Sequence, residues 1–359
     1  MKFLGLDIGG ANLKLATADG HTRSSSFAMW QRHAELTAEL QRLATDVFAQ
    51  PDLIGLTMTA ELADCFSCKE EGVRFILDAT AAAFPGIPLR VWLTSGEFAE
   101  PDDAAELWEL VAASNWHALA TWVGRAVPEG PAILIDVGST TSDLIPLLDG
   151  VPVPDGRTDL NRLRSGELVY TGIRRTPVCA ILQRVNLTDD EHVTISVPLA
   201  AELFATSLDA HLLLGNLLPS ETDCDTADGR AATVVCATVR LAHQLCCDLT
   251  EVSADQLRSF AEQIVAAQQQ QLESALQVVS ARLQQLSDVS ATPVALLSGS
   301  GAFLAERIVA EQAGQWSGTM PLRAMYHRSL ENAECAFAVA RLAAERCLDD
   351  LLPFSAAAV

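Results

Sequence analysis

The stretch "LGLDIGGANLKLATADG" (Leu4 to Gly20) has the same design as "LIDVGSTTSDLIPLLDG" (Leu134 to Gly150). Each runs from an apolar strand through an aspartate, a glycine and small polar residues into a second strand that closes on Asp-Gly. Asp7 corresponds to Asp136 at an offset of 129, and the closing Asp-Gly pairs match after one inserted residue. Two hairpins of one design, one in each half, predict a duplicated α/β domain.

Length and composition predict a folded protein of two domains. The chain has 359 residues, more than one hydrophobic core ordinarily supports, and 49% of them are apolar. Its formal net charge of −22 would repel a polyanion, so we expect neither nucleic acid nor an acidic membrane surface as a partner. No apolar segment reaches the roughly 20 residues that span a bilayer.

The cysteines indicate a reducing compartment. They number nine, and Asp7, Asn12 and Lys14 interrupt the apolar start before it could serve as a secretory signal. We therefore expect a cytoplasmic protein with reduced thiols. Cys65 and Cys68 form a single C-x-x-C pair, which favours incidental thiols over a metal site that would need about four ligands.

The first hairpin fits neither of two common phosphate-binding motifs. A dinucleotide fingerprint needs a third glycine and a following helix, but the residues after Gly9 and Gly10 alternate at period two, which predicts a strand. A P-loop needs an earlier glycine and a Ser or Thr after the lysine, and Lys14 has neither. One such hairpin alone could be a tight turn without a ligand. The matched pair favours a strand-turn-strand loop whose N–H groups approach a phosphate.

Three glycine-containing turns supply the candidate binding residues. Asp7 and Asp136, at the ends of their strands, would face a bound Mg²⁺, mostly through water. Residues of "LDIGGANLK", "IDVGSTTSD" and "LLSGSGAFL" are expected to contact the ligand directly. These residues are Gly9, Gly10, Asn12, Lys14, Gly138, Ser139, Thr140, Thr141, Gly299, Ser300 and Gly301.

In this order and spacing, the three turns resemble the first phosphate, second phosphate and adenosine motifs of the actin, Hsp70 and sugar-kinase (ASKHA) superfamily. The resemblance implies an α/β fold of two RNase-H-like, actin-like ATPase lobes around a ligand cleft, with Mg²⁺ and with ATP or ADP as candidate ligands. We expect the first lobe at residues 1–129 and the second at 130–329, with an arginine-rich insert near 155–200. A C-terminal helix within 330–359 is expected to pack back on the first lobe.

A narrower resemblance rests on "TMTAELADCFSCKEEGV" (Thr57 to Val73), "SGELVYTGIRRTPVCAI" (Ser165 to Ile181) and "DTADGR" (Asp225 to Arg230). These segments are similar to the hydantoinase/oxoprolinase-like family associated with tetrahydromethanopterin-linked one-carbon transfer. Archaeal members of that family include a methanofuran-biosynthesis synthase, which joins a pyrophosphorylated aminomethylfuran to the phenol of γ-glutamyltyramine and releases pyrophosphate. The resemblance therefore implies a Mg²⁺-dependent transferase that acts on a small pyrophosphorylated substrate.

Five residues in these segments are the candidate catalytic groups. Glu61 or Asp64, after the strand "LIGLTMT", would act as the base, although both could instead be acids favourable to a helix dipole. Lys69 could act in catalysis or be a solvated charge beside two glutamates. Arg174 and Arg175 belong to a 28-residue stretch with six arginines, which favours anion binding over a surface pair.

Periodicity predicts the elements between the motifs. The expected helices and strands are a helix from Leu36 to Val47, a strand from Leu53 to Thr59, a helix near Gly72 to Phe84, a strand around Leu89 to Leu93, a helix near Ala104 to Val123, strand and helix within Pro293 to Val309, and a last helix from about Leu330 to Cys347. Ser253 and Gln256 form a plausible capping box that opens a long helix.

The second half also contains a heptad-like repeat, a histidine within a predicted helix, and an Asp-Gly pair. The long helix repeats Val265, Leu272, Val279 and Leu286 at seven residues, which suits a homodimer seam but over so short a run favours an ordinary packing helix. His211 is expected to pack within a helix. Asp228 with its following glycine predicts a turn.

Three functions are compatible with these motifs. The first is the transferase that the family resemblance implies. The second is an ATP-dependent small-molecule kinase or hydrolase of the hydantoinase/oxoprolinase type, which the three nucleotide-like turns would serve equally well. The third is a non-catalytic ligand-binding or assembly protein, which the heptad-like helix would suit.

Overall fold

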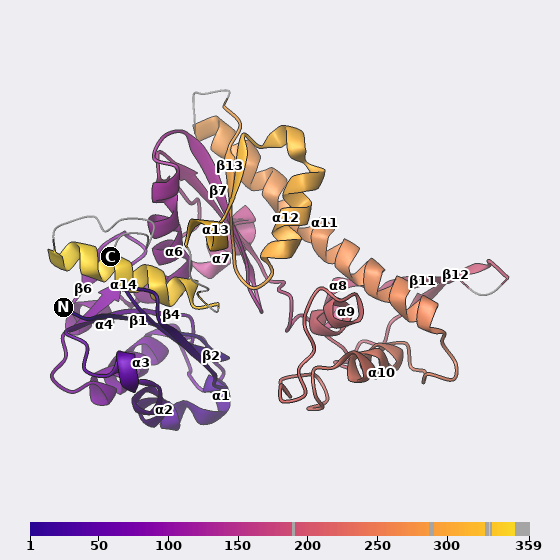
Figure 1. The fold of residues 1–359 in the computed structure, drawn as a ribbon, viewed down its shortest axis with the longest axis horizontal. Helices are drawn as coiled ribbons and strands as arrows, with labels where there is room; N and C mark the ends of the chain where they lie inside the picture. Colours follow the sequence, from indigo (N-terminus) through magenta and orange to yellow (C-terminus); the bar gives the residue numbers. More distant parts are fainter. Residues whose placement is uncertain (189–190, 287–290, 327–329, 331, 349–359) are drawn as a thin grey trace.

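A computed structural model describes residues 1–188, 191–286, 291–326, 330 and 332–348. They form two mixed sheets flanked by helices, and a smaller group of helices with a hairpin lies at the far end of the long helix α11 (Ala254–Leu286) (Figure 1). The expectations that fall on residues 349–359 lie outside the described part of the chain.

The two sheets share one design. The first has the strand order β3-β2-β1-β4-β5-β6, and the second has β10-β8-β7-β13-β14 with β9 beside β8. In each, the opening strand pairs antiparallel with the next strand and parallel with a later one, as in RNase-H-like lobes. The first sheet contains β1 (Phe3–Ile8), β2 (Asn12–Thr17), β3 (Thr22–Ser26), β4 (Leu53–Met58), β5 (Leu89–Trp92) and β6 (Phe98–Ala99). The second contains β7 (Pro131–Val137), β8 (Ser142–Leu148), β9 (Val151–Pro152), β10 (Leu168–Val169), β13 (Val294–Ser298) and β14 (Gly318–Pro321).

The two copies of the sequence repeat form hairpins in which equivalent residues lie opposite each other. Asp7 on β1 lies opposite Lys14 on β2, and Asp136 on β7 lies opposite Asp143 on β8. The Asp-Gly pair at the end of each copy forms a turn, in which the glycine has a positive φ. The predicted α/β fold of two actin-like lobes is confirmed by this topology.

Opposite faces of the first sheet are covered by different helices. Leu4 and Leu6 of β1 belong to the core beneath α2 (Leu36–Leu43) and α3 (Lys69–Ala83). Gly5, between them, faces α14 (Glu334–Leu348), and a Cβ there would lie 1.9 Å from the Ala336 carbonyl oxygen. Glycine therefore lets α14 approach the sheet closely. The Ala-rich C-terminal helix thus packs along β1 and β4 (Figure 1).

The single helix expected near Ala104 to Val123 is wrong. The segment instead forms α4 (Pro101–Glu106), α5 (Trp108–Val111) and α6 (Asn115–Val123). The chain breaks at Leu107 between α4 and α5, and at Ala113 between α5 and α6, where a φ of +51° cannot continue a right-handed helix.

One hydrophobic core joins the two sheets. Trp122 of α6 packs edge to face against Phe337 of α14. The same cluster includes Trp92 of the first sheet and Leu134 and Ile145 of the second. The two lobes therefore meet over α6 and α14 rather than through a flexible linker.

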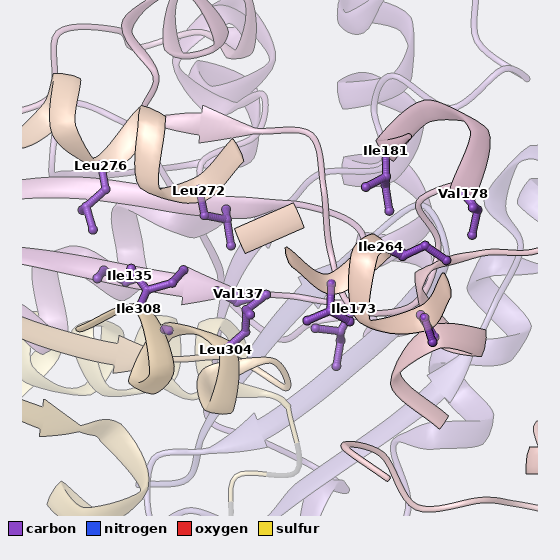
Figure 2. Close-up of a cluster of buried hydrophobic side chains, with 14 of the residues drawn as sticks. Ile135, Val137, Ile173, Val178, Ile181, Ile264, Leu272, Leu276, Leu304 and Ile308 are labelled. Atoms are coloured by element: carbon purple, nitrogen blue, oxygen red, sulfur yellow. The ribbon is translucent and has the colours of Figure 1, made fainter. Parts of the chain in front are cut away.

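A second core runs from the second sheet along α11 into the insert. Figure 2 shows Ile135 and Val137 of β7 near Leu272 and Leu276 of α11. Farther along, Ile264 lies near Val178 and Ile181 of α8 (Val178–Ile181) in the same cluster (Figure 2). The insert's other elements are α7 (Asp159–Ser165), β11 (Arg184–Thr188), β12 (Thr194–Pro198), α9 (Ser207–Leu213) and α10 (Val234–Gln244).

The long helix behaves as a packing helix. Val265, Leu272 and Val279 are buried within this chain, whereas Leu286 is exposed. The capping box is confirmed, because Ser253 and Gln256 each bond the other's backbone N–H. A homodimer remains a prediction, with no seam along this stripe to support it.

Candidate functional site

The first hairpin places a buried ion pair beneath a narrow turn. The Gly9 N–H donates to the Asn12 carbonyl at 3.0 Å, and a Cβ on Gly9 would lie 2.9 Å from that oxygen. Below the turn, the Lys14 ammonium lies 3.5 Å from Oδ2 of buried Asp7. The other carboxylate oxygen of Asp7 has no hydrogen-bond partner among the described residues. A Cβ on Gly10 would meet no atom within 4 Å, so there is open space beside the turn at this residue.

The second hairpin has the same turn over a different pair. Gly138 N–H donates to the Thr141 carbonyl at 2.9 Å, and Ser139 and Thr140 form the tip. Asp136 lies opposite Asp143, another carboxylate. Burial, and then the charge of Asp143, raise the pKa of Asp136 to about 7.

Asp143 is held by a buried arginine from α7. Arg162 Nη2 donates to Asp143 Oδ1 at 2.6 Å, and its guanidinium lies 4.1 Å from the centroid of the Trp116 ring. Trp116 belongs to α6, so this stack connects the second lobe to the helix pair beneath both sheets.

The third glycine turn packs against the second hairpin. Gly299 has a φ of +87°, and a Cβ there would lie 2.6 Å from Asp136 Oδ1. Gly301 N–H donates to the Val137 carbonyl at 2.8 Å. Gly299 and Ser300 line a cavity of about 120 Å³ that Glu334 and Arg323 also border. This volume is below the roughly 300–1,000 Å³ of a typical ligand pocket.

Lys14 links the acids of both hairpins electrostatically. Its charge opposes the effects that raise the pKa values of Asp7, Asp136 and Glu334. Burial alone would lower the pKa of Lys14, but Asp7 and its neighbours raise it above the ordinary value. Lys14 is therefore a charged ammonium among several carboxyls at neutral pH.

A second cluster bridges the lobes at Glu61. Glu61 is buried, its Oε1 lies 3.9 Å from Lys69 Nζ, and its Oε2 has no hydrogen-bond partner among the described residues. Lys69 also lies 3.0 Å from Asp159 of α7 in the other lobe. Burial raises the pKa of Glu61 to about 7, although Lys69 acts to lower it. Asp64, the other candidate base, is exposed on the surface.

The arginine pair lies against the second hairpin. The N–H groups of Arg174 and Arg175 both donate to the Ser139 carbonyl, at 3.0 and 3.1 Å. Their side chains pair with acids of the segment around "DTADGR": Arg174 lies 2.8 Å from Asp223, and Arg175 lies 3.5 Å from Asp225. Each of these two guanidinium groups therefore already forms an ion pair with a carboxylate of the same chain.

His211 and Asp228 both have definite partners in the structure. His211 is buried in α9, where its Nε2 lies 3.0 Å from Gln268 Oε1, and burial lowers its pKa to about 4. Asp228 sits in a turn as predicted and also pairs with buried Arg240 at 3.0 Å. Both are structural contacts, consistent with the expectations for these positions.

The donor set suits a hydrated cation and a phosphate. Within the described residues there is no cluster of three or more His, Cys, Asp or Glu side chains placed to hold a metal ion directly. Asp7 and Asp136 would therefore meet Mg²⁺ largely through its water molecules, a mode that Mg²⁺ favours. The unpartnered oxygen of Asp7 fits such a ligand.

Three polar residues of the site were not expected from the sequence, namely Asp143, Asp159 and Glu334. Arg162 belongs to the arginine-rich stretch that was expected to bind an anion, but its guanidinium pairs with Asp143. Asp143 could have been found, because it stands at the same 129-residue offset from Lys14 as Asp136 does from Asp7. Asp159 and Glu334 reach the site from α7 and α14, and no local pattern marks them.

In the described ranges, no helix is long and apolar enough to cross a membrane.

Comparison with known proteins gives one family and two named relatives. The hydantoinase/oxoprolinase family model matches residues 52–339. The chain is 32% identical over 342 residues to (4-{4-[2-(gamma-L-glutamylamino)ethyl]phenoxymethyl}furan-2-yl)methanamine synthase of Methanocaldococcus jannaschii, covering 94% of this chain and 96% of the relative. The synthase of the same name from Methanococcus vannielii is 38% identical over 124 residues, which are 34% of this chain and 53% of that protein.

A solved structure shares the fold. The nucleotide-free structure of acetone carboxylase, an enzyme of ATP-dependent acetone carboxylation, superposes with a TM-score of 0.55. The match covers 95% of this chain and 70% of the other at 12% identity. At that identity the likeness concerns the fold alone.

Proposed function

The chain belongs to the hydantoinase/oxoprolinase family, and on that premise we propose that it is a Mg²⁺-dependent transferase of methanofuran-type cofactor biosynthesis. Its substrates would be a pyrophosphorylated aminomethylfuran and the phenol of γ-glutamyltyramine. The observation that carries the proposal is the 32% identity to a synthase of that product over nearly the full length of both chains.

The reaction exchanges one carbon–oxygen bond for another. The bond from the furan methylene to the pyrophosphate oxygen breaks, and the phenol oxygen forms a new bond to that carbon. Pyrophosphate leaves with its electron pair, and the phenol proton passes to a base. Mg²⁺ would supply charge neutralisation of the leaving group. The remaining tasks fall to side chains and backbone N–H groups.

The two matched hairpins suit the leaving group. The turns at Gly9 to Asn12 and Gly138 to Thr141 present N–H groups, which can donate to phosphate oxygens. Lys14 adds a full positive charge beside Asp7, and Asp7 and Asp136 would hold the hydrated cation. The third turn at Gly299 and its small cavity would receive the rest of the ligand.

Glu61 suits the base. A general base works best when its pKa lies near the working pH, and burial raises that of Glu61 to about 7. The neighbouring Lys69 would stabilise the ionised form until the phenol proton arrives. Asp64 remains the alternative base in the same loop, and the exposed position of its side chain disfavours it.

A second candidate is an ATP-dependent kinase or hydrolase. The observation that favours it is the third glycine turn, whose cavity lies where the ASKHA resemblance places an adenosine. ATP or ADP would then bind across the same two hairpins. We rank it second because the full-length relative is a synthase by name.

The test supplies the purified protein with the furan pyrophosphate, γ-glutamyltyramine and Mg²⁺, and follows pyrophosphate release and product mass. We expect condensation that stops on chelation of Mg²⁺. Asp136→Asn should abolish it, whereas Asp149→Asn, at the far turn of the same hairpin, should retain it. Absence of product from folded protein, together with hydrolysis of ATP, would favour the second candidate.

The cellular setting remains a prediction. All nine cysteines are free, including the Cys65 and Cys68 pair, which agrees with the reduced interior in which we place the enzyme.

A further inference from the structure

A charge-balanced cluster lies beside the second hairpin and is not used by the proposed chemistry at the carbon. It consists of two arginine–aspartate pairs, Arg174 with Asp223 and Arg175 with Asp225. Their side chains are 27%, 30%, 32% and 52% exposed in that order, so solvent and a ligand can reach all four. Exposed pairs of this kind contribute little to stability, about 0–1 kcal/mol each.

Both halves of the cluster are fixed by buried or stacked neighbours. The arginine backbone is bonded to the Ser139 carbonyl, and the Arg175 guanidinium lies 5.2 Å from the Trp30 ring of the first lobe. The aspartates belong to a loop that the buried Arg240 anchors through Asp228 at 3.0 Å. The four charged groups are therefore held in place before a ligand arrives.

The balance of charge decides which ligand fits. Two guanidinium groups and two carboxylates sum to zero, so the cluster offers a polyphosphate no net attraction. A zwitterion matches it group for group: a ligand carboxylate accepts from the arginines, and a ligand ammonium donates to the aspartates. An α-amino acid carries these two groups on one carbon.

We propose that this Arg–Asp cluster binds the α-amino-acid end of the γ-glutamyl group of the phenolic substrate. The inference rests on the proposed function and deepens it, because it gives the second substrate its own recognition site next to the hairpin that would hold the pyrophosphate. It also reassigns Arg174 and Arg175 from the leaving group to the γ-glutamyl carboxylate. Lys14 then remains the side-chain cation of the pyrophosphate site.

The kinetic test separates the two substrates. Arg174→Gln and Asp225→Asn are each expected to raise the KM for γ-glutamyltyramine by about 10-fold or more, as loss of a hydrogen bond to a charged group does. The KM for the furan pyrophosphate should stay unchanged. With tyramine, which lacks the glutamyl group, the variants and the unmodified protein should perform equally. Glu221→Gln, at an exposed acid of the same loop, is the matched control.

Two outcomes would overturn the inference while the proposed function stands. One is a rise confined to the KM for the furan pyrophosphate, which would return the arginines to the leaving group. The other is an equal loss with tyramine and γ-glutamyltyramine.

A binding measurement covers the case in which no condensation occurs. Calorimetry with γ-glutamyltyramine alone needs no turnover and should show weaker binding to Asp225→Asn than to the unmodified protein. Equal affinity, or no binding to either, would overturn the inference. Absence of turnover with intact, variant-sensitive binding would instead count against the proposed function only. Thermal denaturation of each variant verifies that it is folded.

Discussion

The two lobes have the same strand order and the same glycine turn, yet they differ at one cross-strand position. In the first lobe Asp7 lies opposite Lys14, and in the second Asp136 lies opposite Asp143. Lys14 neutralises Asp7 in the first pair, whereas in the second both partners are acids, and burial followed by the charge of Asp143 raises the pKa of Asp136. The duplicated scaffold therefore places opposite charges at the equivalent cross-strand position, an ammonium at Lys14 and a carboxylate at Asp143.

Away from the hairpins, each lobe contributes one acidic and one basic side chain to the ion pairs of the site. The first lobe contributes Glu61 and Lys69, and the second contributes Asp159 and Arg162 on α7. Lys69 pairs with Asp159 across the two lobes, whereas Arg162 pairs with Asp143 within the second lobe. Substitutions at these positions test whether the asymmetry is what makes the site work.

Among the substitutions that test this asymmetry, the largest effect is expected from making the first hairpin resemble the second. Lys14→Asp would place an acid beside Asp7, and we expect kcat/KM for condensation to fall by about 1,000-fold, since loss of one charge-stabilising donor alone costs about 100- to 1,000-fold. Lys14→Met removes the ammonium without adding a charge, and its kcat/KM for condensation should fall by about 100-fold. The assay is pyrophosphate release.

Lys2→Met provides the lysine control, because Lys2 is exposed at the start of the chain. Near-normal activity of Lys14→Met would show that the cross-strand charge is not used.

A smaller loss is expected at the first lobe's buried acid. Glu61→Gln should lower kcat by about 100-fold, the lower end of the range for a general base. Because burial raises the pKa of Glu61 to about 7, the carboxyl is protonated below that pH and ionised above it. The kcat/KM of the unmodified protein should therefore rise with pH through about 7 and then level off, whereas that of the variant should not show this rise.

Asp64→Asn is the companion variant. If it loses the pH-dependent rise and Glu61→Gln keeps it, the base is Asp64.

The second lobe's extra acid should matter more for stability than for rate. Asp143→Asn keeps an acceptor for Arg162 but removes the charge of a partner at 2.6 Å, so the free energy of unfolding should fall by about 2 kcal/mol. Chemical denaturation measures it. Glu306→Gln, which breaks the more exposed pair with Arg323, should cost less. Equal costs would mean that the Asp143 pair is not the stronger one.

The smallest effect is expected at the contact between the lobes. Lys69→Met removes the pairs with Asp159 and Glu61 and should lower the free energy of unfolding by less than about 1 kcal/mol. Because Lys69 lowers the pKa of Glu61, its loss should move the midpoint of the pH profile to higher pH. Arg74→Met, which breaks a pair with Glu70 on the same helix, should leave the midpoint in place. If the midpoint of the pH profile is unchanged in both Lys69→Met and Arg74→Met, Lys69 does not influence the pKa of the catalytic base.

The sequence predicted structural features formed by neighbouring residues, and it did not predict contacts between residues far apart in the chain. The hairpins around Asp7 and Asp136 were predictable because the strand, turn and strand lie within a few residues. Glu61 was also found, since it follows a buried strand. Its burial and its contact with Lys69 could not be, because they depend on how α3 packs.

The remaining site residues come from distant segments. Arg162 on α7 reaches Asp143 across the second lobe, and Glu334 comes from the start of α14. The arginine-rich stretch contains Arg162 but does not reveal that Asp143 is its partner, and no periodicity or motif singles out Glu334. The break at Ala113 was missed for a similar reason, because alanine favours helix by itself and only tertiary contacts impose its positive φ.

The position of α14 has a consequence for how the protein is made. Its partners β1 and β4 are complete by Met58, but the helix begins only at Glu334. During synthesis the face of the first sheet that carries Gly5 therefore waits uncovered until almost the whole described chain has left the ribosome. The lobe translated first should be the last to gain its full set of contacts, and an interrupted nascent chain would expose an apolar sheet face that invites aggregation or chaperone binding.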